Sequence, residues 1–157
     1  MKSQYININD PDFNRKVLEI VSRNEGGTYS LHIFQNGKPK SLSRAFGVDE
    51  KGILYIGENE KDLLSRVNSL RKSIMLNCNP NQKKPQLGGH QTLSKKYYRI
   101  RKHIDENQLH IIVNPIKVSN KEDESALIEA YVRDHGEIPP LNGTYGNGTK
   151  EYWHYYH

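Results

Sequence analysis

From Tyr29 to Ile33 every second residue is apolar, and this period of two limits the possible folds more than any other feature. Such alternation is typical of a half-buried β-strand. Asn36-Gly37 follows soon after and is a strong β-hairpin signal. A second apolar segment covers residues 53 to 56. The pattern therefore predicts two strands of one small sheet, joined by a polar insert.

Four helices are predicted from apolar residues that recur at helical spacing. Their expected ranges are about 11 to 23, 60 to 76, 93 to 106 and 119 to 134. The first would begin at Asp10-Pro11, and the last near Ser119 or Asn120, where Ser119-x-x-Glu122 has the form of a capping box. Residues 109 to 113 resemble a third strand. This order of elements predicts an α/β (α+β) domain with a small sheet covered by helices.

The composition is mildly basic, because 23 Lys and Arg outnumber 18 Asp and Glu. A net charge of +5 favours polyanions only weakly, so the placement of the basic residues matters more than their number. Cys78 is the only cysteine, which excludes an internal disulfide and fits a reducing cytosol. No apolar run approaches the ~18 residues that suggest a membrane span. We therefore expect a soluble, cytoplasmic protein that does not engage a membrane.

Glu124 is the most informative single residue. Leu127, Ile128 and Tyr131 follow it at helical spacing, so its carboxylate would lie in an apolar stripe. Burial of an unpaired carboxylate costs on the order of several kcal/mol, and would require a cation or a metal as partner. Alternatively, Glu124 lies in the first helical turn, where the helix dipole favours it, and stays open to water. The sequence leaves both interpretations open.

Three further residues stand out. Arg66 lies at the edge of its helix's apolar stripe, where its guanidinium would either reach a phosphate over a sheet edge or face water. Tyr29 and Tyr55 lie in the two predicted strands, where tyrosine usually packs. Even together with Glu124, these three residues do not by themselves identify an enzyme.

Taken in chain order, however, these residues resemble the GIY-YIG nuclease family. The matching segments are Gly27-Thr28-Tyr29, Tyr55-Ile56-Gly57, Arg66 nine residues after Gly57, Glu124-Ser125-Ala126-Leu127-Ile128 and Pro139-Pro140-Leu141-Asn142. Each segment alone is weak evidence, whereas five in the right order on matching secondary structure are hard to obtain by chance. The resemblance implies a small, mainly antiparallel three-stranded sheet flanked by helices. It covers about residues 27 to 142, which leaves residues 1 to 26 as an N-terminal helical extension and 143 to 157 as an aromatic tail.

The resemblance implies hydrolysis of a DNA phosphodiester with Mg²⁺, which Mn²⁺ is expected to be able to replace. Glu124 would hold the metal, which acts as a Lewis acid on the phosphate. Tyr29 would orient the attacking water or accept its proton, and Tyr55 would position the same site. Arg66 would stabilise charge on the phosphate in the transition state. Asn142 would hold the glutamate helix and the site in place.

The link between the two tripeptides departs from the family pattern. Tyr29 and Tyr55 lie 26 positions apart, which is longer than in the simplest members. The insert, from about residue 35 to residue 51, would form a hairpin that touches DNA or places a lysine beside Tyr29, or would be an ordinary solvated loop. Its candidate DNA-binding residues are Lys38, Lys40 and Arg44. Thr28 replaces the family's isoleucine, which is a tolerable β-branched exchange.

The histidine that many relatives place soon after the arginine is also absent, since Leu70 occupies that position. His90 follows two glycines that would let the backbone approach a ligand closely. His32 is its rival, as a strand neighbour of Tyr29. Either histidine would assist catalysis, or both are surface residues without a role.

DNA contacts are expected on one face of the third helix, opposite its apolar stripe. The basic residues of this face are Lys95, Lys96, Arg99 and Lys102. They would neutralise phosphates and make binding salt-dependent, or would simply be solvated. Double-stranded DNA is the expected partner, and a homodimer would suit cleavage of a palindrome. Trp153, Tyr155 and Tyr156 of the tail would stack on bases, or pack on the domain or a second subunit.

The sequence therefore predicts a Mg²⁺-dependent DNA endonuclease of the restriction or mobile-element type. Two alternatives stay open. A catalytically inactive relative would bind nucleic acid or protein without Mg²⁺-dependent turnover. A structure-specific repair nuclease would cleave branched DNA but not linear duplex.

Overall fold

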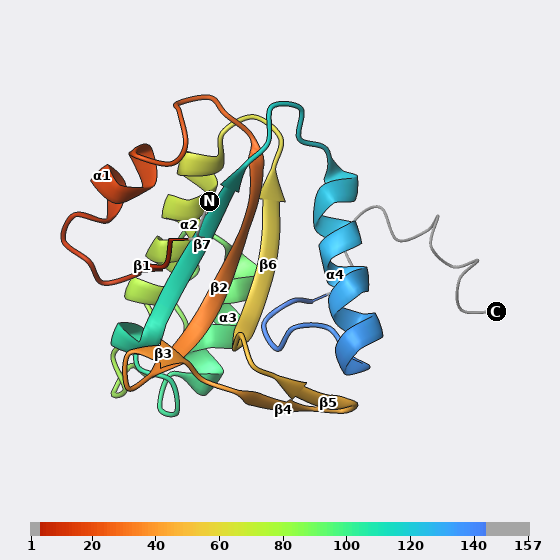
Figure 1. Ribbon diagram of the computed structural model, residues 1–157. Helices are drawn as coiled ribbons and strands as arrows, with labels where there is room; N and C mark the ends of the chain where they lie inside the picture. Colours follow the sequence, from red (N-terminus) through yellow and green to blue (C-terminus); the bar gives the residue numbers. More distant parts are fainter. Residues whose placement is uncertain (1–3, 144–157) are drawn as a thin grey trace.

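Strand β2 (Gly27–Gln35) is the centre of the sheet in this computed structural model, which describes residues 4 to 143 (Figure 1). It pairs antiparallel with β7 (Leu109–Pro115) on one side and with β6 (Ile53–Asn59) on the other. Two short strands extend the sheet, because β1 (Ile6–Asn7) pairs with β7 and β3 (Lys38–Pro39) pairs with the end of β2. The predicted antiparallel sheet is therefore confirmed, with three long strands and two short ones.

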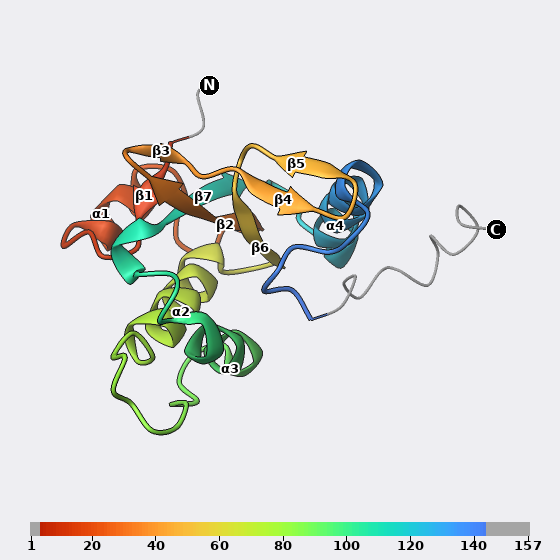
Figure 2. The ribbon, with the colours of Figure 1, turned by 90° about the horizontal axis from the view of Figure 1, so that it is seen from below.

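Within residues 4 to 143, four α-helices flank this sheet, so the domain belongs to the mixed α/β class. The helices α2 (Leu63–Met75) and α3 (Gln91–Ile100) form a layer on one face of the sheet, as Figure 2 shows. Helix α4 (Lys121–His135) lies beside the outer edge of β6, and α1 (Phe13–Leu18) lies on the opposite side, near β1. A short 3₁₀ helix, η1 (Glu106–Gln108), leads into β7.

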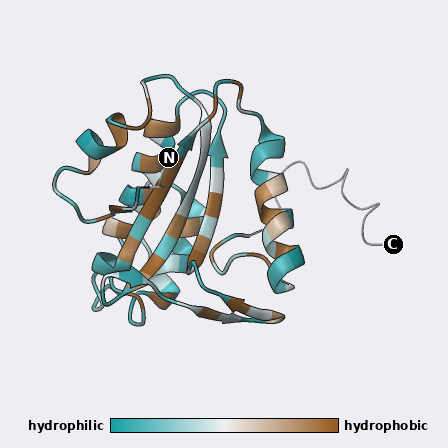
Figure 3. Ribbon diagram, viewed as in Figure 1, coloured by the Kyte–Doolittle hydropathy of each residue, from teal (hydrophilic) through white to brown (hydrophobic). Residues whose placement is uncertain are grey.

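The two-residue period of β2 decides which side chains face the helical layer. Tyr29, Leu31 and Ile33 are buried in one apolar core with residues of α2 and α3. Tyr55 of β6 joins this core, whereas Ile56 packs with α4 in a second cluster. Figure 3 shows the apolar residues concentrated along the central strands. Both candidate tyrosines therefore lie on the sheet face that α2 and α3 cover.

The N-terminal segment has less helix than predicted and belongs to the core. Helix α1 has six residues, and its N-cap is Asp12 instead of Asp10. The Asp12 N–H donates a hydrogen bond to the Asp10 carboxylate. Phe13 and Val17 are buried in the core that contains β2. The expected helical extension of residues 1 to 26 thus also supplies strand β1 and core packing.

Helix α3 begins earlier than predicted, whereas the N-cap of α4 is Asn120, the second of its two predicted starts. His90 caps α3, so this helix begins at Gln91, and it ends at Ile100. The capping box of α4 consists of Asn120 and Asp123, one position later than predicted. Asn is as good an N-cap as Ser, so the sequence pattern alone does not separate the two adjacent positions.

The insert between β2 and β6 forms a hairpin that packs on α4. Its strands are β4 (Leu42–Arg44) and β5 (Gly47–Asp49). At the turn between them, the Phe46 N–H donates to the His135 carbonyl at 3.0 Å. The Phe46 ring lies against Gly136, the left-handed C-cap of α4, where a Cβ atom would be 2.2 Å from the ring. The insert therefore supports the C-terminal end of α4.

The aromatic tail, with Trp153, Tyr155 and Tyr156, lies outside the described residues. Between residues 4 and 143, none of the helices combines the length and the apolar character that crossing a membrane requires. Cys78 is a free thiol.

Candidate active site

Tyr29 and Tyr55 lie side by side on β2 and β6. In the register of the sheet, Tyr29 is opposite Gly57 and Tyr55 is opposite Leu31. The ring centroids of the two tyrosines are 6.0 Å apart. A Cβ atom on Gly57 would lie 2.4 Å from Tyr29 Oη, so only glycine leaves room for this ring. The glycine of the second tripeptide therefore makes space for the tyrosine of the first.

The Tyr29 hydroxyl is a buried polar group. The residue is 1% exposed, and its Oη makes no hydrogen bond to any of the described residues. Arg66 and Tyr55 lie close to it but outside hydrogen-bond geometry. Burial raises the pKa of Tyr29 well above its usual value, and Arg66 opposes this effect. An unpaired buried hydroxyl costs about 1 to 3 kcal/mol, so a ligand oxygen at Oη would be stabilised.

Arg66 reaches both phenols from α2. Its helix neighbours turn into the core, which leaves Arg66 half-buried at the edge of the apolar stripe. Burial lowers the pKa of Arg66. The electrostatic influence of Tyr29, Tyr55 and Glu124 outweighs burial, so the pKa of Arg66 is raised overall. The guanidinium therefore stays charged and interacts electrostatically with two phenols and one carboxylate.

Glu124 reaches the same place from the first turns of α4. It is half-buried, while Leu127 is 44% exposed, so the helix turns the carboxylate inward more than the leucine. Burial raises the pKa of Glu124 to about 7, and the neighbouring Glu58 carboxylate adds to this. Arg66 and a hydrogen bond from the Glu58 backbone act in the opposite direction. The structure thus combines the two interpretations of Glu124, because the residue lies in the first turns and is also partly buried.

Glu58 lies beside Glu124 at the candidate site and was not predicted from the sequence. It follows Gly57 directly on β6, and its buried Oε2 has no hydrogen-bond partner in the part of the chain that the structure describes. Burial raises the pKa of Glu58, and Glu60 adds to this. Its place directly after the second tripeptide is the one signal that could have marked it. Two neighbouring carboxylates favour a cation between them.

Within residues 4 to 143, His, Cys, Asp and Glu form no group of three or more that could hold a metal ion. Mg²⁺ is commonly bound by one or two carboxylates, with water completing its octahedral shell. The carboxylates of Glu58 and Glu124 are therefore ligands of the type and number that Mg²⁺ commonly uses.

Of the two candidate histidines, His90 contacts a candidate tyrosine. His90 Nε2 lies 3.1 Å from Tyr55 Oη. His32 lies on the opposite face of the sheet, hydrogen-bonded to Ser30 and to the Lys51 carbonyl. This follows from the alternation of β2, where His32 and Tyr29 point to opposite faces. The sheet therefore separates His32 from Tyr29, and His90 is the histidine that lies at the candidate site.

Asn142 ties the closing segment to β6. Its Oδ1 accepts from the Ile56 N–H and its Nδ2 donates to the Ile56 carbonyl, both at 2.9 Å. The Leu141 N–H donates to the Leu54 carbonyl at 2.8 Å, so the segment follows the strand. Asn142 is buried and acts on the site by holding the strand that carries Tyr55.

Asn142→Ala is expected to destabilise the fold. It would leave both backbone groups of Ile56 without a partner in a buried place, and each costs about 1 to 3 kcal/mol. The free energy of unfolding should therefore fall by about 2 to 4 kcal/mol in denaturant titrations. Asn81→Ala, at an exposed position, is the control. Equal stability of the two variants would contradict this role of Asn142.

The site thus gathers Tyr29, Tyr55, Arg66 and Glu124 from four different elements, together with His90, the N-cap of α3. No family model, curated protein or solved structure matches this chain. The similarity to GIY-YIG nucleases therefore rests on these residues and their geometry, and is taken up as a proposal.

The basic residues concentrate in one part of the chain. Residues 63 to 104, which comprise α2, the loop after it and α3, contain ten Lys and Arg and no Asp or Glu. The rest of the chain contains the other 13 basic residues and all 18 acidic ones. The helical layer on one face of the sheet is therefore strongly positive, although the net charge of the chain is only +5.

The predicted DNA-binding residues differ in their surroundings. The exposed ones are Lys38, Lys40, Lys95, Arg99 and Lys102. Arg44 has an 11% exposed side chain, donates to the Ile138 carbonyl at 2.7 Å and lies 3.2 Å from Glu137. Lys96 donates to the Asn142 carbonyl. Arg44 therefore holds the insert on the segment after α4 and is not a surface residue, and Lys96 links α3 to the closing segment.

Proposed function

We propose that this chain is a Mg²⁺-dependent DNA endonuclease of the GIY-YIG type, acting in restriction or in a mobile element. The convergence of Tyr29, Tyr55, Arg66, His90 and Glu124 from separate elements is the observation that supports it. Phosphodiester hydrolysis needs a group that orients water, a cation for the phosphate and a carboxylate for the metal. These residues supply all three.

Glu124 and Glu58 are proposed to hold the metal. Mg²⁺, or Mn²⁺ in its place, supplies Lewis-acid polarisation of the phosphate when it is bound. The pKa of Glu124 is raised to about 7 by burial and by Glu58, and a cation beside the two carboxylates would counteract both effects. Binding of Mg²⁺ is therefore expected to release a proton near neutral pH.

Tyr29 is proposed to orient the attacking water. Burial keeps its pKa well above the usual value, so the hydroxyl retains its proton at neutral pH. A phenol can accept one hydrogen bond from water while it donates another to a phosphate oxygen. The raised pKa of Tyr29 therefore favours a role in orienting the water over a role in accepting its proton.

Arg66 is proposed to stabilise the charge that develops on the phosphate. Its guanidinium is charged and half-buried, and such a group acts more strongly there than in water. Tyr55, the other phenol that Arg66 influences, would position the same phosphate by a hydrogen bond.

Double-stranded DNA is proposed to lie along the basic layer formed by α2 and α3. Because phosphate contacts release counterions, binding there is expected to weaken steeply with salt. Changing Lys95, Arg99 and Lys102 together to Gln should lower the slope of log K against log salt by about 2 to 3. Fluorescence anisotropy of a labelled duplex, measured over a series of salt concentrations, gives this slope.

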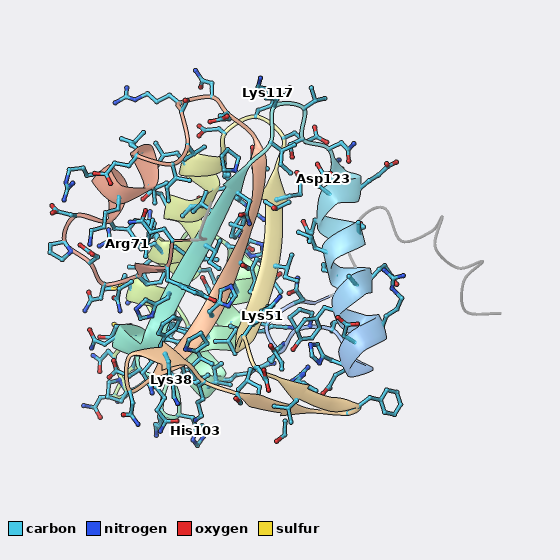
Figure 4. All side chains as sticks on the ribbon, in the orientation of Figure 1. Lys38, Lys51, Arg71, His103, Lys117 and Asp123 are labelled. Carbon is cyan, nitrogen blue, oxygen red and sulfur yellow. The ribbon has the colours of Figure 1, made fainter. Side chains whose placement is uncertain are left out.

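The matched control changes Arg23, Lys117 and Arg133 to Gln, which removes three exposed charges outside that layer. Lys117 lies at the opposite end of the molecule from Lys38 and His103 (Figure 4). The control should retain the wild-type slope. An equal reduction in both triple variants would argue against binding along the α2–α3 layer.

The experiment that tests the activity incubates the purified full chain with plasmid DNA at low salt, with Mg²⁺ or with a chelator. Discrete Mg²⁺-dependent bands would support a restriction-type endonuclease. Cleavage of a branched substrate alone would favour the repair nuclease instead. A gel shift without any cleavage would overturn the activity and favour a binding module. Sedimentation of the DNA complex would test the proposed homodimer.

A further inference from the structure

His90 uses both ring nitrogens at once. The Leu93 backbone N–H donates to His90 Nδ1 at 3.3 Å, which makes the imidazole the N-cap of α3. On the other side of the ring, Nε2 lies 3.1 Å from Tyr55 Oη. A neutral imidazole has one N–H and one unprotonated nitrogen. Because a backbone N–H can only donate, Nδ1 must be the unprotonated nitrogen and Nε2 must carry the hydrogen.

This assignment gives the bond to Tyr55 a direction. Nε2–H donates and the phenol oxygen of Tyr55 accepts. The hydrogen of the Tyr55 hydroxyl is therefore not used by His90 and is available for a ligand oxygen. In this state His90 has no free nitrogen that could accept a proton from water, because its one basic nitrogen is occupied by Leu93.

The backbone of His90 is held against α2. Its N–H donates to the buried Ser73 Oγ at 2.6 Å. The preceding Gly89 has a φ of 68° and lies so close that a Cβ atom would be 2.2 Å from the Ser69 carbonyl. Only glycine combines this φ with this approach. Hydrogen bonds at the backbone N–H, at Nδ1 and at Nε2 therefore fix the position of the imidazole.

We propose that His90 is a positioning residue, which donates from Nε2 to Tyr55 and so directs the Tyr55 hydroxyl toward the phosphate. This role rests on the proposed nuclease function, whereas the tautomer of His90 does not. Burial, with Arg66 adding to it, lowers the pKa of His90, which supports the neutral form at physiological pH. Positioning by His90 differs from proton transfer by His90 in two measurable ways.

The first measurement is the tautomer itself. NMR of the full chain with ¹⁵N-labelled histidine shows which ring nitrogen carries the hydrogen, and loss of the signal in His90→Asn assigns it. We expect His90 to be neutral and protonated on Nε2 at pH 7.5. Protonation on Nδ1, or a charged imidazole at that pH, would overturn the proposal. This result does not depend on whether the protein cleaves DNA.

The second measurement separates the two ring nitrogens by substitution. The Asn amide matches the position of Nδ1 and can cap α3, but it does not reach Tyr55. The Gln amide matches the position of Nε2 and can donate to Tyr55, but it caps poorly. We therefore expect His90→Asn to keep its melting temperature and to lose cleavage about 100-fold. His90→Gln should melt a few degrees lower and keep cleavage within about tenfold.

If His90 only caps α3, cleavage would follow the melting temperature. His90→Asn would then keep both, and His90→Gln would lose both. A general base would give equal losses of about 100-fold or more in both variants. Either pattern would overturn the positioning role. If the wild type itself shows no Mg²⁺-dependent cleavage, the nuclease function and the positioning role are overturned together, and the NMR result still decides the tautomer.

Discussion

Glu124→Gln is expected to abolish Mg²⁺-dependent cleavage while the protein stays folded and binds DNA. The amide keeps the size of the side chain but removes the charge that would hold the metal. Metal stabilisation of the transition state is worth on the order of several kcal/mol, so the rate should fall by about a thousandfold or more. Cleavage of plasmid DNA, followed over time, measures this loss.

The same substitution should stabilise the metal-free protein at high pH. Burial raises the pKa of Glu124 to about 7 in the folded protein, against a reference value of 4.5. Well below pH 4.5 the group is neutral in both states and has no effect. As the pH rises toward 7 the unfolded chain ionises first, so the folded wild type loses stability, and above 7 the loss is complete.

Solvent screening of this half-buried group limits the expected gain for Glu124→Gln to about 1 to 2 kcal/mol at pH 8. This corresponds to about 3 to 6 °C in melting temperature, and the gain should vanish well below pH 4.5. Added Mg²⁺ should raise the melting temperature of the wild type and leave that of the variant unchanged.

Glu122→Gln is the matched control, because Glu122 lies on the same turn of α4 and is exposed. It should cleave DNA like the wild type and show no pH-dependent gain in stability. Cleavage at the wild-type rate by Glu124→Gln would disprove the proposed role of this carboxylate in the metal site. An absent gain at pH 8 would instead contradict its partial burial.

Gly57→Ala is expected to remove both cleavage and part of the stability. The new methyl group would lie 2.4 Å from Tyr29 Cζ and from Tyr29 Oη, so the ring must move. Tyr29 is a core residue packed against α2, and overpacking of a core costs about 1 to 3 kcal/mol. Displacement of the Tyr29 hydroxyl by even about 1 Å can cost on the order of 100-fold in rate.

Thermal unfolding and plasmid cleavage measure the two effects of Gly57→Ala. Gly143→Ala is the control, because its nearest contact would be Thr92 at 3.7 Å, an ordinary van der Waals distance. Tyr29→Phe separates the effects, since it removes an unpaired buried hydroxyl and should lose cleavage without losing stability. If Gly57→Ala retains wild-type stability and cleavage, the close approach of Tyr29 to β6 is not required.

Local patterns determined the secondary structure. The alternation that begins at Tyr29 and the apolar stripes of α2 and α3 depend only on neighbours in the sequence, and each of these elements is present, although α3 ends at Ile100 instead of near residue 106. The helix starts differ from the predicted ones by up to three positions, because neighbouring Asp, Asn and Ser side chains are alternative caps and because His90 caps α3. The same alternation already contained the reason to reject His32, since it places His32 and Tyr29 on opposite faces of β2.

The composition of the site depended on the tertiary structure. Glu58 helps to raise the pKa of Glu124 from 66 positions away in the sequence, and Arg44 donates to a carbonyl 94 positions later. His90 reaches Tyr55 only because Ser73 holds the loop before α3 on α2. Sequence periodicity specifies which face a side chain occupies, but hydrogen bonds and burial between distant segments arise only when those faces pack against each other. The residues of the site except Glu58 were therefore readable from the chain, whereas their partners, pKa values and hydrogen-bond directions were decided by packing.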